Sequence, residues 1–294
     1  MSLPGEPRRV ASVGDVRVAY LDDGQGPPVL LLHGCPFASF VWRRLIPLLA
    51  PEHRCLAPDL LGLGDTETAD GADWTLTAQA EMVIGLLDSL GIDAVDLVGH
   101  DHGAAVAQVL AAHHVARVRR LVLADAEAYD NWPSREERPF VRATQIPLLG
   151  DLLLYLWSRP AVLRATLVRA KAVHDPRALS DEFVRQLVRA NFADTHRRRK
   201  TRRFFAEQFE PSNNRVTLEI VDGLRSFDHP TLLVWGANDA HFGPEWGERL
   251  RSDIAGAQRL EVLASTGHLL MEERPEEFGA MVREFLDEHG GPVQ

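Results

Sequence analysis

The stretch Leu97-Val98-Gly99-His100-Asp101-His102-Gly103-Ala104-Ala105 decides the fold of this 294-residue chain. The stretch at 95–98, which is apolar except for Asp96, predicts a short strand that breaks at Gly99. A helical pattern of small residues begins directly afterwards, at Ala104. The two glycines of the G-x-D-x-G spacing allow helix and strand to approach closely, so the turn presents its middle side chain over the edge of a sheet. That side chain is the carboxylate of Asp101.

A carboxylate at such a turn favours a particular chemistry. It can displace a good or strained leaving group from saturated carbon, and this forms an alkyl ester of Asp101. The alternative interpretation is structural, because an aspartate at a helix N-terminus also interacts favourably with the helix dipole. The other motifs of the chain distinguish the catalytic from the structural interpretation of Asp101.

The composition is that of an ordinary soluble globular protein, with 45% hydrophobic and 25% charged residues. The net charge of -10 argues against nucleic acid or an anionic membrane as a partner. Cys35 and Cys55 are too few for a disulfide framework, so we expect reduced thiols and a cytoplasmic location. The first thirteen residues show no secretory signal, and no segment has the roughly 18 apolar residues of a membrane helix. Whether the protein is a monomer or a homodimer stays open.

Short apolar runs alternate with amphipathic helical patterns along most of the chain. We expect strands at 16–21, 29–32, 54–58, 95–98, 121–124, 231–235 and 260–263, and helices at 40–49, 77–90, 244–254 and 275–288. This alternation predicts an α/β protein with a mostly parallel sheet and helices on both faces.

Between residues 131 and 222 the strand pattern disappears. Helical patterns dominate there, at 148–157, 161–172, 181–190 and 195–209. We therefore predict a core formed by residues 1–130 and 223–294, with a helical cap at 131–222 over the carboxyl ends of the strands, where such sheets bind ligands. A basic run at 196–203 is interpreted as a solvated face of a cap helix.

Two further polar residues follow predicted strands. Asp239 comes just after the strand at 231–235, and His268 comes just after the strand at 260–263. The order nucleophile, acid, histidine is that of the catalytic triad in the α/β-hydrolase fold. His268 is therefore the candidate base, and Asp239 is the candidate acid that orients it.

Over nearly its full length the chain resembles the α/β-hydrolases of the haloalkane dehalogenase and epoxide hydrolase branch. The motifs that carry the resemblance are His33-Gly34-Cys35-Pro36, Gly99-His100-Asp101, Trp235-Gly236-Ala237-Asn238-Asp239 and Gly267-His268. The resemblance implies a nucleophilic Asp101 whose ester is released by water activated by His268. It also implies an oxyanion hole formed by the backbone N–H groups of Cys35 and His102. The expected partners are a small apolar organic substrate and water. We expect no cofactor and no metal.

The identity of the acid stays open between two positions. Asp125 ends the predicted strand at 121–124, where some dehalogenases of this branch place the partner of the histidine. We favour Asp239, because its Trp-Gly-x-x-Asp context is complete, and keep Asp125 as the alternative. A structural hydrogen-bonding role is the other interpretation of Asp125, and Glu127 is a third candidate for the acid.

The leaving-group residues of the branch are incomplete in this chain. Dehalogenases that resemble it carry Trp directly after the nucleophile, where this chain has His102. Trp132 and Trp157 are the candidate substitutes. His33 and Phe37 are further candidates for substrate binding, because they belong to the segment of the His-Gly-x-Pro motif.

Epoxide hydrolases of the branch donate a proton to the opening ring from two cap tyrosines. Tyr155 lies where one of them is expected, whereas the second region carries phenylalanines. His102 or Tyr129 are the candidate replacements. We therefore predict an epoxide hydrolase, with haloalkane dehalogenase as the alternative. A ligand-binding or non-hydrolytic biosynthetic protein on the same scaffold is a third possibility.

Overall fold

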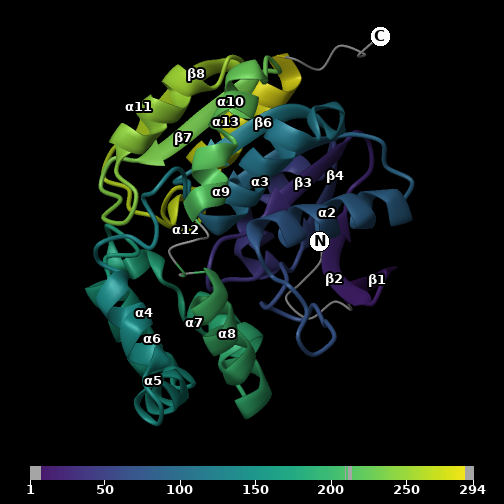
Figure 1. Cartoon of the computed structure of the whole chain (residues 1–294). Helices are drawn as coiled ribbons and strands as arrows, with labels where there is room; N and C mark the ends of the chain where they lie inside the picture. Colours follow the sequence, from purple (N-terminus) through teal and green to yellow (C-terminus); the bar gives the residue numbers. More distant parts are fainter. Residues whose placement is uncertain (1–7, 209, 211–213, 289–294) are drawn as a thin grey trace.

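The computed structural model describes residues 8–208, 210 and 214–288. The ends of the expected core, 1–7 and 289–294, and residues 209 and 211–213 of the expected cap lie outside the described residues. Within them, eight strands form one sheet in the order β1-β2-β4-β3-β5-β6-β7-β8 (Figure 1). The strands are β1 (Arg9–Val13), β2 (Val16–Asp23), β3 (Pro28–Leu32), β4 (Arg54–Pro58), β5 (Val95–His100), β6 (Val118–Ala124), β7 (Thr231–Gly236) and β8 (Ala257–Leu263).

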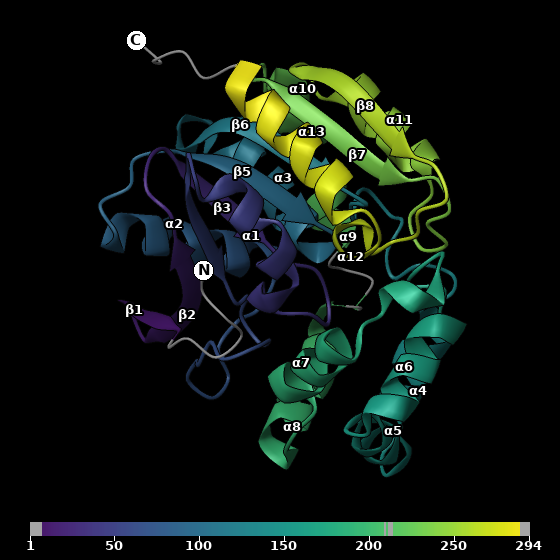
Figure 2. The ribbon, with the colours of Figure 1, turned by 180° about the vertical axis from the view of Figure 1, so that it is seen from behind.

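The sheet is parallel from β4 to β8, whereas β1 pairs antiparallel with β2 and β2 pairs antiparallel with β4. The central strands consist of apolar runs because helices cover both of their faces. One face carries α2 (Leu76–Ser89), α3 (His102–His113), α10 (Val221–Ser226) and α11 (Pro244–Asp253) (Figure 1). The other face carries α1 (Ile46–Leu49) and α13 (Pro275–Glu288) (Figure 2). The expected fold class is thereby confirmed.

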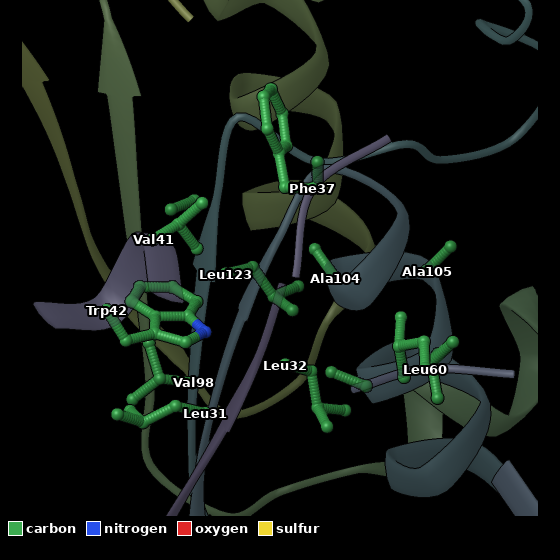
Figure 3. Close-up of a cluster of buried hydrophobic side chains, with 14 of the residues drawn as sticks. Leu31, Leu32, Phe37, Val41, Trp42, Leu60, Val98, Ala104, Ala105 and Leu123 are labelled. Atoms are coloured by element: carbon green, nitrogen blue, oxygen red, sulfur yellow. The ribbon is translucent and has the colours of Figure 1, made fainter. Parts of the chain in front are cut away.

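The core beneath the site is tightly packed. Figure 3 shows side chains from β3, β5 and β6 meeting residues of the loop after β3 and the small residues of α3, and Leu31, Leu32, Val98, Leu123 and Trp42 are all buried. The small residues matter because α3 lies directly on β3. A Cβ atom at position 103 would lie 2.2 Å from the backbone oxygen of Leu32, so only glycine fits there.

The cap is a separate helical lobe below the carboxyl ends of the strands in Figures 1 and 2. It consists of α4 (Arg138–Gln145), α5 (Leu149–Trp157), α6 (Pro160–Arg169), α7 (Asp181–Asn191) and α8 (Thr195–Gln208). We expected the cap to continue to residue 222, but α9 (Asn214–Glu219) and α10 pack on α3 in the core. Gly223 of α10 lies so close to α3 that a Cβ atom there would be 2.7 Å from the Cβ of Ala112.

The basic run of α8 attaches the cap to the core, so its interpretation as a solvated face is wrong. Lys200 Nζ donates to the backbone oxygen of Gly64 at 2.7 Å, and Arg197 pairs with Asp65 at 2.7 Å. The guanidinium of Arg203 lies 3.9 Å from the ring centre of Trp74. A run of charges in the sequence does not show which of them meet backbone carbonyls of a distant loop.

Other differences are local. The expected helix at 40–49 is a 3-10 helix, Ser39–Arg44, followed by α1, and β1, α4, α9, α10 and α12 (Leu270–Glu273) were not expected. These elements are short, so each contains too few residues to establish a hydrophobic pattern. Among the described residues, every helix is too short or too polar to cross a membrane.

Candidate active site

Asp101 lies in the turn between β5 and α3, with a φ of 54° and a ψ of -123°. A residue other than glycine rarely adopts this conformation, and it persists where the surrounding structure enforces it. The carboxyl group packs against the loop after β3. A Cβ atom at position 34 would lie 2.5 Å from the Cβ of Asp101 and 3.0 Å from its Oδ1, so Gly34 leaves the room that this side chain needs.

The two carboxylate oxygens of Asp101 have different partners. Oδ1 accepts hydrogen bonds from the backbone N–H of Cys35, at 3.2 Å, and from that of His102. Oδ2 lies 2.8 Å from Nε2 of His268. One oxygen is therefore held by two fixed backbone donors, and the other faces an imidazole.

Asp239 completes the chain of contacts. Its Oδ2 lies 2.9 Å from Nδ1 of His268, and its Oδ1 accepts from the backbone N–H groups of His241, at 2.7 Å, and Phe242, at 3.1 Å. These two backbone donors fix the carboxylate, which in turn orients the imidazole. The structure thus brings together Asp101, His268 and Asp239.

The electrostatics of the three groups are strongly coupled. Burial opposes the charge on Asp101, but the hydrogen bond and positive charge of His268 outweigh it and lower the pKa of Asp101. Burial also opposes the charge on His268, but the charge of Asp239 and its hydrogen bonds to both carboxylates raise its pKa well above the usual value. The free site is therefore an imidazolium between two carboxylates.

Asp125, the alternative acid, does not contact the imidazole by a hydrogen bond that the structure shows. Its Oδ1 accepts from the backbone N–H of Gly236 at 2.9 Å, which ties the end of β6 to the end of β7. Burial raises the pKa of Asp125 well above its usual range, and the charge of Asp239 raises it further. The structure places Asp239, and not Asp125, against His268.

Two of the expected leaving-group residues point elsewhere. Tyr155 is 46% exposed, and its hydroxyl accepts from the Arg159 guanidinium at 3.1 Å on the outside of the cap. Trp157 donates through Nε1 to Thr166 at 3.1 Å and stacks on Phe140, so it packs the cap interior. Helical spacing located both residues in the cap but not the direction of their side chains, and their expected contact with the substrate does not fit these positions.

Tyr129 and His33 also serve the structure. The hydroxyl of Tyr129 donates to Asp253 at 2.8 Å, away from the triad. Nε2 of His33 accepts from the backbone N–H of Leu60 at 3.0 Å, and burial lowers the pKa of His33 to about 4. This neutral imidazole joins the loop after β3 to the loop after β4.

Phe37 and Trp132 do lie beside the site. The ring of Phe37 is buried, 6.4 Å from the ring of His100, the residue that precedes the nucleophile. Trp132 is buried with its ring centre 6.1 Å from that of His102. The same tryptophan borders a cleft of about 870 Å³ between α4, α8 and α9, which is also lined by Val141, Phe205, Leu218, Arg138 and Arg142. Trp132 therefore lies between this cleft and the imidazole of His102.

Two features of the site were missed by sequence reasoning. The N–H of His241 donates to Asp239 two residues earlier, a turn that the spacing of an Asp after a strand could have suggested. Glu127, considered only as a partner of His268, instead lies 2.8 Å from Nδ1 of His102. No local pattern announces this second contact, because it joins a loop to a helix 25 residues earlier.

Metal binding has one buried candidate among the described residues. Ligand atoms of His100, Asp125 and His268 lie within 4.8 Å of one another. However, Nε2 of His100 already contacts the backbone oxygen of His268 at 2.9 Å, and both nitrogens of His268 face carboxylates. These hydrogen bonds use the atoms that a metal would need.

The comparisons with known proteins agree with this geometry. A family model described as alpha/beta hydrolase fold matches residues 27–275. The chain belongs to the α/β-hydrolase fold family. Haloalkane dehalogenases are among its relatives, in agreement with the resemblance seen in the sequence.

Three similar proteins illustrate the relationship. A cis-3-alkyl-4-alkyloxetan-2-one decarboxylase of Shewanella oneidensis is 30% identical, over 92% of this chain and 86% of the relative. Haloalkane dehalogenase 2 of Mycobacterium tuberculosis is 29% identical, over 91% of each chain. The crystal structure of the haloalkane dehalogenase DbeA from Bradyrhizobium elkani is 26% identical, with a TM-score of 0.81 over 97% of this chain and 98% of that one.

Proposed function

We propose that this α/β-hydrolase cleaves a bond at a saturated carbon through an alkyl ester of Asp101. The observation that supports this is that the two carboxylate oxygens of Asp101 have different partners. Oδ1 is held by backbone N–H groups, and Oδ2 faces His268. The thiol of Cys35 is no competing nucleophile, because burial raises its pKa well above the usual value.

In the first step, Oδ2 of Asp101 forms a bond to the substrate carbon, and the bond from that carbon to the leaving group breaks. The negative charge of Asp101 is lost in this step. Its charge and hydrogen bond are among the causes that raise the pKa of His268, so this pKa falls when the ester forms. The imidazolium then releases its Nε2 proton to solvent, and the neutral imidazole can act as the base of the second step.

In the second step, His268 takes a proton from water, and the hydroxide attacks the carbonyl carbon of the ester. The developing negative charge is carried by Oδ1, which the N–H groups of Cys35 and His102 already hold. Each such donor typically contributes about 10² to 10³ in rate. Collapse of the intermediate releases an alcohol and regenerates the carboxylate.

The leaving group we propose is the oxygen of a strained ring, as in an epoxide. The residue after the nucleophile supports this, because His102 can supply a proton, which an alkoxide needs and a halide does not. Halide release is the second candidate. It is favoured by the dehalogenase relatives, whereas the oxetan-2-one decarboxylase relative acts, by its name, on a strained oxygen ring.

The ester route is tested by His268→Gln. This variant should be alkylated at Asp101 but should not release the product, so intact-mass analysis should show a stable adduct. A single turnover of the wild type in H₂¹⁸O should label Asp101 and leave the product unlabelled. Label in the product of the first turnover would show direct attack by water and refute the ester. A screen of epoxides for diol and of bromoalkanes for halide then identifies the leaving group.

A further inference from the structure

The imidazole of His102 is placed unusually for the first residue of a helix. It is fully buried, and it meets the ring of Phe204 of α8 edge-on, at 5.3 Å between centres, as well as that of Trp132. Its Nδ1 is used by Glu127, but its Nε2 is buried and has no hydrogen-bond partner among the described residues. Such an unpartnered polar atom costs free energy unless it has a function or a ligand.

Glu127 is held firmly beside this imidazole. It follows β6 by three residues, and its backbone N–H donates to the backbone oxygen of Asp101 at 3.3 Å. Its own backbone oxygen accepts from the side chain of Gln108 of α3 at 2.8 Å. The carboxyl group is 4% exposed and 2.8 Å from Nδ1 of His102. A carboxyl group and an imidazole are therefore fixed together next to the nucleophile.

The pair is neutral rather than ionic. Burial lowers the pKa of His102 to about 4. Burial raises the pKa of Glu127 well above its usual range, and the charges of Asp101 and Glu137 and a hydrogen bond to Asp101 raise it further, against a lowering effect of His268. When the single proton of Glu127 is directed to Nδ1 of His102 rather than to Asp101, the imidazole proton of His102 lies on Nε2. The unpartnered nitrogen is then a donor.

We propose that His102 Nε2 donates a proton to the departing oxygen of the substrate, and that Glu127 replaces that proton through Nδ1. The inference rests on the proposed function, and it makes strained cyclic oxygen compounds the substrate class. His102 and Glu127 then supply the proton that two cap tyrosines supply in the epoxide hydrolases of the branch.

The proton and charge balance of the step is complete. Oδ2 of Asp101 bonds to the ring carbon, the carbon–oxygen bond breaks, and its electron pair stays on the oxygen. That oxygen takes the proton of His102 Nε2, while Nδ1 takes the proton of Glu127. Asp101 loses one negative charge and Glu127 gains one, so the buried charge of the site does not change.

This exchange of charge also makes Glu127 most acidic at the step in which its proton is needed. The charge of Asp101 is one of the causes that raise the pKa of Glu127. Esterification removes that charge, so Glu127 becomes a stronger acid while the alkoxide forms. Hydrolysis of the ester restores the charge of Asp101, and Glu127 binds a proton again. Release of the product then leaves the site ready for another turnover.

The test compares two leaving groups on the same carbon chain. The rate of Asp101 alkylation is measured by intact mass in the His268→Gln background, with 1,2-epoxyhexane and with 1-bromohexane. Adding Glu127→Gln should lower the epoxide rate about 10²- to 10³-fold, the range of a lost proton donor, and the bromide rate far less. Glu137→Gln is the matched control, because it removes a nearby carboxylate that does not contact His102. It should change the ratio of the two rates less than threefold.

A pH profile provides a readout that a structural role of Glu127 would not change. Alkylation by the epoxide should decrease as the pH rises through the pKa of Glu127, because an ionised Glu127 holds the imidazole proton on Nδ1. The groups that set this pKa are Asp101, Glu137, His102 and, in the wild type, His268. The decrease should be absent with the bromide, and absent in Glu127→Gln.

The outcomes separate this inference from the proposed function. If neither probe alkylates Asp101, the ester route fails, and the inference fails with it. If the bromide reacts and the epoxide does not, the substrate class is wrong. If the epoxide reacts equally fast with and without Glu127, or both rates fall together, the proton relay is refuted while the ester route stands.

Discussion

Replacement of Asp239 by asparagine should separate the two steps of the reaction. The side chain keeps its shape, and its oxygen can still accept from the N–H groups of His241 and Phe242. The atom that faces Nδ1 of His268, however, becomes an amide nitrogen, which is a donor. The imidazole must then move its proton to Nε2, and in this tautomer Nε2 cannot accept a proton from water.

The expected loss follows from this change of tautomer. Placing the wrong tautomer in a triad of the same logic costs about 10⁴ in turnover. We expect Asp239→Asn to reduce turnover by about 10³ to 10⁴, which corresponds to roughly 4 to 5.5 kcal/mol of barrier. Alkylation of Asp101 should be much less affected, because Oδ1 keeps its two backbone donors. The ester should therefore accumulate.

Asp125→Asn is the matched control. Burial and the charge of Asp239 raise the pKa of Asp125, which favours its neutral carboxyl group, and the amide has nearly the same shape as that group. Its oxygen can still accept from the N–H of Gly236. We expect turnover within about fivefold of the wild type, since conservative changes that keep a hydrogen bond cost little.

The assay is quench-flow with intact-mass detection of the ester, together with steady-state product formation. Asp239→Asn should show a large ester population and slow turnover, and Asp125→Asn should show neither. The reverse result, a slow Asp125→Asn and a nearly normal Asp239→Asn, would refute the assignment of the acid. A loss in both variants with no ester would show that Asp239 acts before alkylation.

Three further changes test separate parts of the structure. Gly34→Ala places a Cβ atom 2.5 Å from that of Asp101, so the carboxylate must move by about 1 Å. The rate of Asp101 alkylation, measured by stopped flow, should therefore fall about 10²-fold. A normal rate with an unchanged melting temperature would contradict the packing argument. Asn191→Ala removes two hydrogen bonds, one that Asn191 donates to the oxygen of Pro36 at 2.8 Å and one that it accepts from the N–H of Gly64 at 3.0 Å. The free energy of unfolding, measured by urea titration, should fall by about 2–4 kcal/mol. A loss below 0.5 kcal/mol would mean that water replaces both bonds. Tyr155→Phe should leave epoxide turnover within twofold, because its hydroxyl is on the exposed side of the cap, and a tenfold loss would restore it as a proton donor.

The fold could be predicted because its signals are local. The run at 95–98, the break at Gly99 and the small residues after it specify a strand, a turn and a close-packed helix without reference to any other part of the chain. The apolar runs of the other parallel strands have the same property, since a strand that is covered on both faces must be apolar along its whole length. Short cap helices such as α4, with eight residues, were missed for the converse reason, because two turns contain too few residues to establish a pattern.

The order of Asp101, Asp239 and His268 along the chain also suggested the three residues that the structure brings together, with Asp125 kept as an alternative to Asp239. Carboxyl ends of parallel strands meet at one edge of the sheet, so position along the sequence translates into proximity. Position along the sequence does not, however, show in which direction a side chain points. It could not decide between Asp125 and Asp239, because both follow strands whose ends lie side by side.

The sequence by itself determined most of the strands, the longer helices, their order and the carboxylate at the turn, because these follow from periodicity and from glycines where no side chain fits. Only the tertiary structure decided that Tyr155 faces outward and that Glu127 faces His102. Those facts depend on the backbone angles of loops and on side chains from distant segments that compete for the same space. No spacing rule along one segment contains that information.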